Sequence, residues 1–578
     1  MLRATGPRYV SAVTTPPAVE LRPPNTVMKL ARLGSFHQSR LSFMRVLLRR
    51  LARERWTFER VRFDIAEPGV GVAVYEARGP ERTYSLVAFA HDLPADQRSD
   101  RVIAQAWDST YALVDGVADD ATIERLAANV PLQEAGRVSA GELTLSRANR
   151  SVRLFEHVVD RLAAGEQPEP AKLDEVGYLM RTTAVYGSGK FGLADRERIA
   201  DRPELEGPFQ AEMLTVFLIR AFTLDLVEHL ATLRSPATAV PMDPALRRSL
   251  GVGNATGLGM APFVINHPSL FSNWIVAKET ALARVRALPT AGLEAQTRFL
   301  ELLERAQVNA ASWRSVHELQ MEKVAALVAD LDALADIAPA LIAGPEPWDR
   351  LVRWADDALD LEGQEQLVSL VLEPYSDLVD DLATEMGSDE GAFFAIEGSM
   401  TTSELTALVA DVYGWAIGID WDTHHETARA WYVSEDKLEP RMGERHEELI
   451  EPYESPLAPG RDAAKLHADL LAWDGEATVA AFLLVHPEHR FVTRRAQQSV
   501  AFPYAEIRDN TISADVLPID MLRCKLSYFG ATRFDPRSDR WVRIIMFRHA
   551  PFPDELDDLP VDTIDDWGYP PLGEVGAR

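Results

Sequence analysis

The sequence contains very little cysteine. Cys524 is the only cysteine among 578 residues, which excludes an internal disulfide framework and any zinc site built from several cysteines. Cys524 lies in the apolar run MLRCKLSYFG. Because free cysteine is among the most buried residue types, we expect a structural thiol here rather than a nucleophile. The scarcity of cysteine suits a reducing compartment, and we expect a cytoplasmic protein.

Long apolar runs and an excess of basic residues are also missing. No stretch approaches the roughly 18 uncharged apolar residues that a membrane-spanning helix needs. Lysine and arginine total 60 against 88 aspartate and glutamate residues, giving a net charge of −28. A nucleic-acid binder needs a basic face for the phosphates. We therefore expect neither a membrane nor a nucleic acid as partner.

Several signatures of known enzyme and repeat classes are absent as well. No Gly-x-Ser-x-Gly motif occurs, which argues against a standard α/β-hydrolase. No repeat of fixed period is found, which argues against a solenoid. Carboxylates are so numerous that no pair stands out as a glycosidase couple.

The composition and the patterns that are present predict a folded α+β multi-domain protein. Hydrophobic residues make up 47% and charged residues 26% of the chain, values typical of globular proteins, and the length suits roughly two to four domains. The composition and the hydrophobic pattern of the sequence change at four points, which divide the chain into five parts. The predicted parts are an N-terminal arm (1–27), an α/β domain with an antiparallel sheet (28–165), a mainly helical bundle (166–415), a C-terminal α+β region (416–553) and an acidic tail (554–578).

The N-terminal arm and the segment after it are rich in arginine and poor in acid, since Glu20 is the only carboxylate before Glu54. We expect the arm to pack on an acidic surface, such as that of another subunit, and the protein to form a homo-oligomer. Apolar residues at helical spacing predict an amphipathic helix over 36–56 that covers a sheet. The runs VRFDIA, GVAVYEAR and YSLVAFAHDL predict strands, with a hairpin turn at 79–82.

The middle of the chain is helical in pattern, and Trp313 and Trp348 are expected in its core. Beyond residue 416, the runs RFVTRRAQQSVAFPYAEIRDNTISADVLP and LSYFGATRFDPRSDRWVRIIMFRHA look β-rich, the second as a hairpin around 535–539. The end of the chain is acidic, rich in proline and without periodicity. We expect it to wrap a neighbour or to stay mobile.

The first candidate site is the segment RTTAVYGSGKFGLAD. It contains Arg181, Gly187, Gly189 and Lys190, and glycines beside an ammonium group suit a phosphate or carboxylate. It is no Walker A motif, because Ala184 and Phe191 replace a required glycine and a required serine or threonine, and because we expect a helix rather than a strand before it. The alternative is an ordinary glycine-bearing turn between helices, with Lys190 exposed.

The second candidate is SLGVGNATGLGMAPFVINHPSLFSNW. Its glycine spacing differs from the dinucleotide-binding fingerprint, so we expect no Rossmann cofactor. We expect a glycine loop at 251–259 whose backbone N–H groups and polar side chains line a pocket, with His267 as a base or as a helix cap. The residues assigned to this wall are Gly253, Asn254, Thr256 and Gly257.

Two later segments are weaker candidates. The first holds His424 and His425, followed further on by His486 and His489 in HPEH. This density suits a divalent metal, but the spacing matches no strong zinc signature, so surface or interfacial histidines explain it better and no metal is assigned. The second runs from Trp431 to Arg441 and forms either a lid that carries Lys437 and Arg441 or a salt-bridge network between domains. Arg494 is added as a further cation.

These candidates together predict a soluble enzyme that acts on a small anionic metabolite without a cofactor. Arg181, Lys190 and a late arginine, Arg441 or Arg494, would bind the anionic group. The glycine loop would stabilise developing negative charge, and His267 or a loop carboxylate would move the proton. Lys190 and Lys437 are further catalytic candidates. The alternatives are a non-catalytic assembly or regulatory protein, and a metal-dependent hydrolase that uses the late histidines.

Overall fold

A computed structural model gives the arrangement of most of the chain. It describes residues 20–29, 32–94, 96–97, 106–131, 141–186, 202–254, 268–313, 318–387, 395–421, 431–434, 439–442, 454–456, 459–508, 523, 525–531, 533–536, 542–559 and 563–569. The statements below refer to these residues.

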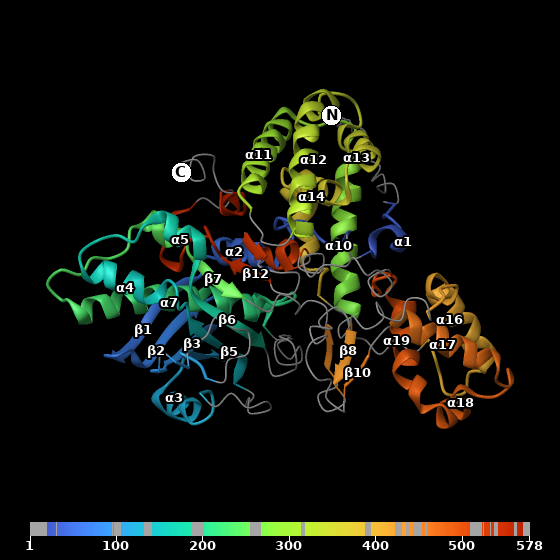
Figure 1. Ribbon diagram of the computed structural model, residues 1–578, viewed down its shortest axis with the longest axis horizontal. Coiled ribbons are helices and arrows are strands. Elements are labelled where there is room, and N and C mark those ends of the chain that lie inside the picture. The colour runs from blue at the N-terminus through green and yellow to red at the C-terminus, as the bar shows by residue number, and fades with distance from the viewer. Residues whose placement is uncertain are drawn as a thin grey trace, which may run out of the picture.

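The fold is α+β, as the sequence predicts, with a large sheet, a central helical bundle and a C-terminal region of helices and strands (Figure 1). The large sheet has nine strands in the order β1-β2-β3-β4-β5-β6-β7-β12-β11. Its strands are β1 (Thr57–Ala66), β2 (Val70–Arg78), β3 (Thr83–Ala90), β4 (Ser109–Asp115), β5 (Glu142–Arg150), β6 (Tyr178–Tyr186), β7 (Gly251–Asn254), β11 (Arg533–Pro536) and β12 (Val542–Met546).

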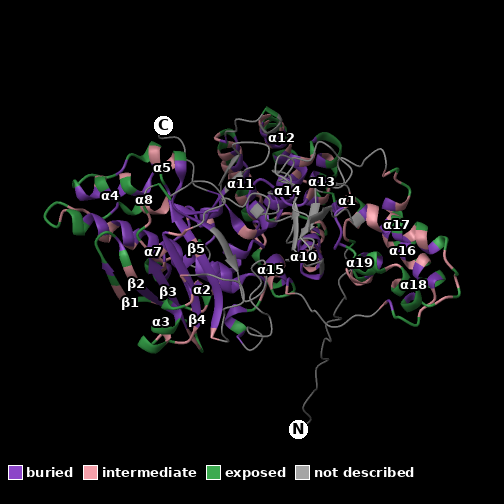
Figure 2. Cartoon of the chain, turned by 60° about the horizontal axis from the view of Figure 1, so that its bottom comes forward, coloured by how far each residue is buried: buried purple, intermediate pink, exposed green. Residues whose placement is uncertain are grey.

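The first six strands form an antiparallel meander, and their sequence explains why. The predicted turn at 79–82 joins β2 to β3, and the N–H of Gly79 donates to the carbonyl of Arg82 at 2.8 Å. β3 and β4 are rich in β-branched and aromatic residues and are buried along almost their whole length (Figure 2). Strands buried on both faces need helices on both sides of the sheet.

Helices cover the two faces of this meander. One face packs against α7 (Gln210–Arg234), where Phe222 contacts the ring of Tyr111 edge-on at 5.6 Å. The opposite face buries Val87 and Ala112 beneath α3 (Asp120–Ala127). The remaining helices around the sheet are α4 (Phe155–Ala163), α5 (Pro170–Val176) and α8 (Pro244–Arg248).

The helical bundle follows β7 in the chain and buries Trp348 and Trp313 in its core, as predicted. Most of its helices have alanine and leucine at 3.6-residue spacing on the buried side. They are α10 (Pro268–Arg286), α11 (Leu293–Ala311), α12 (Glu318–Ile342), α13 (Pro347–Ala358), α14 (Leu361–Leu372) and α15 (Ser376–Val379), followed by the 3-10 helix η3 (Asp380–Ala383).

A smaller group of helices has a hydrophobic core of its own, built around Leu405, Leu466 and Phe482. Its first helix begins with a capping box, in which Thr401 and Glu404 satisfy each other's backbone N–H groups. Its elements are α16 (Thr402–Ile417), α17 (Pro459–Leu471), α18 (Val479–Val485), the 3-10 helix η5 (Pro487–His489) and α19 (Arg490–Ala501). We call this group the small helical unit.

Two predictions for the C-terminal region need correction. The run that begins at Arg490 is predicted to be β-rich, but its first part forms α19, because Val492, Ala496 and Ser499 lie on one buried face at helical spacing. The part of this run beyond residue 508 lies outside the described residues. The run LSYFG forms the π-helix η6 (Lys525–Gly530) instead of a strand. The hairpin predicted around 535–539 is confirmed, since β11 and β12 pair with Pro536 opposite Val542.

The described N-terminal residues, from residue 20 onward, pack against the rest of the chain. The described part of the arm includes the short helix α1 (Pro24–Val27), and Arg22 pairs with Glu279 of α10 and Glu365 of α14 within the same chain. The predicted amphipathic helix is α2 (Phe43–Arg53), but it is buried on nearly all sides. Arg45, only 1% exposed in its side chain, pairs with Glu373 at 2.6 Å.

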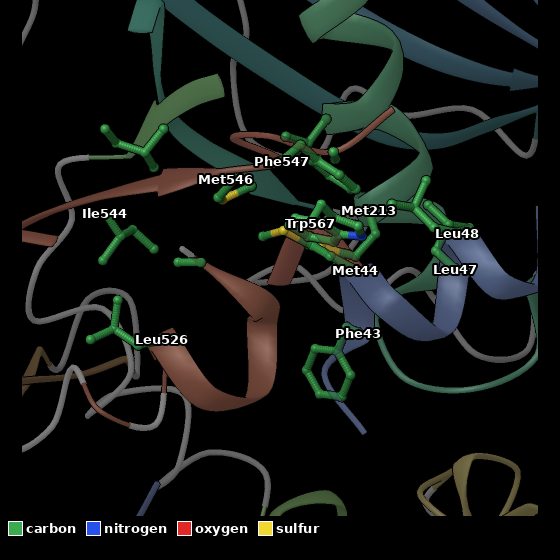
Figure 3. Close-up of a cluster of buried hydrophobic side chains, with 14 of the residues drawn as sticks. Phe43, Met44, Leu47, Leu48, Met213, Leu526, Ile544, Met546, Phe547 and Trp567 are labelled. Atoms are coloured by element: carbon green, nitrogen blue, oxygen red, sulfur yellow. The ribbon is translucent and has the colours of Figure 1, made fainter. Parts of the chain in front are cut away.

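The described residues of the acidic C-terminal segment also pack into the core, in contrast to the expected mobile or wrapping tail. They form the 3-10 helices η7 (Pro553–Asp558) and η8 (Asp566–Gly568). Asp565 pairs with Arg45 and Arg49 of α2. Figure 3 shows how α2 and η8, from opposite parts of the chain, come together: side chains of α2, α7, η6, β12 and η8 form one hydrophobic cluster that includes Trp567.

Candidate functional site

The two glycine-rich segments predicted as sites follow neighbouring strands. β6 and β7 are a parallel pair, with Tyr178 opposite Gly251, Arg181 opposite Gly253 and Thr182 opposite Asn254. Two parallel strands present their carboxyl ends at the same edge of a sheet. Residues 187–192 and 255–259 therefore both begin at this edge, which we call the β6/β7 edge.

The structure corrects one argument made from the sequence. We expect a helix before the Gly-x-Gly-Lys segment, but the strand β6 precedes it. The β-branched residues of RTTAVY fit a strand, and their pairing with β5 and β7 on both sides fixes it. A glycine-rich segment after a strand is the usual position for a phosphate-binding loop, although Ala184 and Phe191 still depart from the Walker A pattern.

β6 and β7 end at different positions along the strand direction. Asn254, the last residue of β7, is opposite Thr182, and β6 continues for four further residues to Tyr186. At about 3.3 Å per residue this stagger is roughly 13 Å. β7 thus ends four residues before β6 does, so the β6/β7 edge forms a step rather than a flat rim.

Arg181 is buried within the sheet, with a relative exposure of 1%. It is opposite Asn149 of β5 on one side and Gly253 on the other. Asn149 in turn accepts a hydrogen bond from the N–H of Asp108 at 2.9 Å, and Asp108 is fully buried. A row across the strands is thus formed by Asp108, Asn149, Arg181 and Gly253, and the first three of these residues have polar side chains.

Sequence analysis missed Asp108 and Asn149, because neither lies in a recognisable motif. Their carboxylate and carboxamide satisfy backbone groups: the second oxygen of Asp108 accepts from the N–H of Arg150 at 3.0 Å. Buried polar groups need such partners. The one signal in the sequence is their position near strand ends, since Asp108 directly precedes β4 and Asn149 is the penultimate residue of β5.

The structure gives Gly251 and Gly253 a packing role. Both belong to β7, which pairs with β6 and β12 on its two sides, so they are strand residues and do not form the expected loop. A Cβ atom on Gly251 would lie 2.3 Å from the carbonyl oxygen of Met546, and one on Gly253 would lie 2.7 Å from the ring of Tyr178. Close packing of neighbouring strands therefore requires glycine at both positions.

Most of the remaining site residues lie outside the described part of the chain. Asn254 is described and is 7% exposed at the end of β7. Arg441 belongs to β9 (Glu439–Met442), which pairs with β8 (Trp431–Ser434) and, through it, with β10 (Glu454–Pro456). The site residues outside the described ranges are Gly187, Gly189, Lys190, Thr256, Gly257, His267 and Lys437.

Arg494 is the late arginine whose side chain is described, and it is exposed on α19. Figures 1 and 2 both show α19 and the large sheet on opposite sides of α10. The neighbouring Arg495 is buried and pairs with Glu506. The structure therefore brings Arg181, Gly253 and Asn254 together and leaves Arg494 in the small helical unit.

The late histidines fall into two groups. His424 and His425 lie outside the described residues. His486 and His489 lie in the small helical unit, where His489 is 3% exposed and its Nε2 is 2.7 Å from Asp469 Oδ2. His489 therefore does not lie at the surface, the first of the two expected positions, and an interfacial position stays a prediction. Asp469 comes from another helix, α17, and the sequence carries no signal for this contact.

No protein-family model matches the chain, and comparisons with curated proteins and with solved structures also found no match. Among the described helices, none combines the length and the apolar character that crossing a membrane requires.

Proposed function

We propose that the protein is a cytoplasmic enzyme that binds a small anionic metabolite, bearing carboxylate or phosphate, at the β6/β7 edge and acts on it by acid/base chemistry. The observation that supports this proposal is the parallel pairing of β6 with β7, with Arg181 opposite Gly253. Ligands of α/β sheets commonly bind beyond the carboxyl ends of parallel strands. Two segments rich in glycine, which are distant in the sequence, both start there.

Each residue of the proposed site has a chemical role. Lys190 supplies an ammonium group to the anion. Backbone N–H groups near Gly187, Gly189 and Gly257 would add hydrogen bonds to it, and the side chains of Asn254 and Thr256 would orient the ligand.

Proton transfer is assigned to His267. It directly precedes α10, which begins at Pro268. The unpaired N–H groups of a helix N-terminus favour negative charge nearby, so a ligand bound beside His267 would also benefit from the dipole of α10. Arg181 lies deeper, in the buried row, and we assign it to the positive potential beneath the ligand.

Binding of simple anions tests the proposal. Thermal unfolding of the whole protein is measured with inorganic phosphate, pyrophosphate and citrate, in a buffer of constant ionic strength. We expect at least one of them to raise the unfolding temperature, since a ligand that binds only the folded state stabilises it. The variant Lys190→Gln should weaken this effect about ten-fold in apparent affinity, as expected for the loss of one charge-assisted hydrogen bond.

The matched control is Lys465→Gln. Lys465 is exposed on α17 in the small helical unit, so the substitution removes the same charge far from the sheet. Equal anion affinity in both variants and the parent protein would contradict the proposal. The alternative, a non-catalytic assembly protein, stays open. Arg22, which belongs to the described part of the arm, pairs within its own chain. A homo-oligomer remains part of the proposal, and light scattering measures it.

A further inference from the structure

The small helical unit gathers a set of side chains that can hold a metal ion. One oxygen of Asp469, one of Glu488 and one ring nitrogen of His489 all lie within 4.8 Å of one another. Asp469 comes from α17, whereas Glu488 and His489 come from η5. We propose that Asp469, Glu488 and His489 form a binding site for a first-row divalent transition metal, with Zn²⁺ as the representative ion.

The chemistry of the three ligands suits such an ion. An imidazole nitrogen with two carboxylate oxygens is a mixed N/O set that zinc, manganese and iron accept, whereas magnesium and calcium prefer oxygen alone. Two carboxylates and one neutral imidazole carry two negative charges, which balance a divalent cation. Three protein ligands also leave a position for water, as in sites of the open type.

The geometry needs little adjustment. Nε2 of His489 and Oδ2 of Asp469 are 2.7 Å apart. In a tetrahedral zinc site with bonds of about 2.0–2.1 Å, neighbouring ligand atoms are separated by roughly 3.3 Å. The contact therefore has to open by about half an ångström. Glu488 is exposed and can turn toward the ion from the solvent side.

Surrounding side chains hold the imidazole in place. The ring of Phe482, which is fully buried, stacks on His489 at 5.7 Å with an interplanar angle of 7°. Nδ1 of His486 is 3.3 Å from Oε1 of Glu488. A histidine that contacts a ligating carboxylate is a typical outer partner of a metal site, so we assign His486 a positioning role. The imidazole of His489 is thus held in position, and binding of an ion requires small movements of Asp469 and Glu488.

This site is separate from the β6/β7 edge. It lies in the small helical unit, and α10 separates that unit from the large sheet in both views (Figures 1 and 2). An ion bound here would join α17 to the connection between α18 and α19. The two proposals therefore fail or succeed independently.

Titration of the full-length protein with Zn²⁺ after treatment with a chelator tests the site. Glu488→Gln is the first variant, because Glu488 is exposed and its replacement should leave the fold intact. We expect its Zn²⁺ affinity at this site to fall about ten-fold or more, the size of effect seen when metal sites lose a supporting group. Asp469→Asn should act in the same direction, and Mg²⁺ should bind the parent protein more weakly than Zn²⁺ does.

Glu476→Gln is the matched control, since Glu476 is also exposed in the small helical unit and loses the same charge. It should bind Zn²⁺ like the parent protein. A second readout is the rise in unfolding temperature caused by Zn²⁺, which Glu488→Gln should reduce and Glu476→Gln should keep. Identical Zn²⁺ stoichiometry and affinity in the parent and Glu488→Gln proteins would overturn the proposal, as would equal losses in both variants.

Discussion

Replacing Glu365 by glutamine should destabilise the protein strongly, because this carboxylate lies among three cations in the interior. It is 1% exposed on α14. Its oxygens are 3.0 Å from Arg22 Nη1, 3.3 Å from Arg32 Nη1 and 2.9 Å from Lys278 Nζ. Glu279, which pairs with Arg22 at 2.8 Å, is the second carboxylate of the group. A neutral amide at position 365 would leave three cations facing one anion.

The magnitude follows from the pKa of Glu365. Burial by itself would raise this pKa, but the charges of Arg22 and Lys278 outweigh burial and lower it from 4.5 to about 2. A difference of one pKa unit corresponds to about 1.4 kcal/mol, so the carboxylate contributes about 3 kcal/mol. This agrees with the roughly 3–5 kcal/mol lost when one partner of a buried ion pair is removed.

The effect should depend on pH in a definite direction. Because the pKa is lower in the folded state, the unfolded state binds more protons as the pH falls below about 4.5. The contribution of Glu365 is therefore complete at pH 7 and shrinks as the pH falls toward 2. The glutamine variant does not titrate at this position, so its deficit relative to the parent should shrink in the same range.

Urea unfolding followed by tryptophan fluorescence measures the effect, since Trp274 and Trp348 report from the core around the bundle. The comparison is made at neutral pH and at steps down to pH 3. Glu304→Gln is the control, because Glu304 is exposed on α11. The reasoning is refuted if Glu365→Gln is as stable as Glu304→Gln at pH 7, or if its deficit is unchanged at acid pH.

Two further predictions concern stability and ionisation in the core. Gly253→Ala should cost about 1–3 kcal/mol in thermal unfolding, since the new Cβ would lie 2.7 Å from the ring of Tyr178. The control is Gly414→Ala in α16, where a new Cβ would meet no atom within 4 Å apart from its chain neighbours and its own helix backbone. This control should not destabilise the protein, because alanine is a better helix former than glycine, and equal losses in both variants would contradict the packing argument. Burial lowers the pKa of His37 to about 4, so its imidazole signals in NMR spectra should not shift between pH 8 and 5. His37 should also make the folded protein less stable as the pH falls from about 6.5 toward 4, because in this range only the unfolded state protonates the imidazole. If the NMR signals of His37 titrate near pH 6.5, the imidazole is not buried as described.

Local pattern in the sequence determined most of the elements. Alternation of apolar residues on either side of Gly79 and Arg82 specified the hairpin of β2 and β3, because a strand presents its residues alternately to two faces. Alanine and leucine at 3.6-residue spacing specified the helices of the bundle. The pattern failed at α19, where Phe491, Val492 and Thr493 have strand propensity and burial of a helical face prevailed.

Only the tertiary structure decided which elements meet. The sheet takes β1 to β5 from the first part of the chain, β6 and β7 from the predicted helical region and β11 and β12 from the last part. The sequence of β7 does not specify which strands it pairs with, since the backbone hydrogen bonds between strands are the same for any sequence. The register that sets Arg181 beside Gly253, and so supports the proposed site, comes from this long-range pairing.

The charged and histidine-rich segments show the same difference between what the sequence determines and what the tertiary structure decides. The sequence alone showed an arginine-rich start, an acidic end and a histidine-rich turn, because composition is visible without a fold. It did not show that Arg45 meets Asp565, or that His489 meets Asp469. Such contacts form because burial of apolar side chains brings distant segments together, and a buried charge such as that of Arg45 is then stable only beside an opposite one.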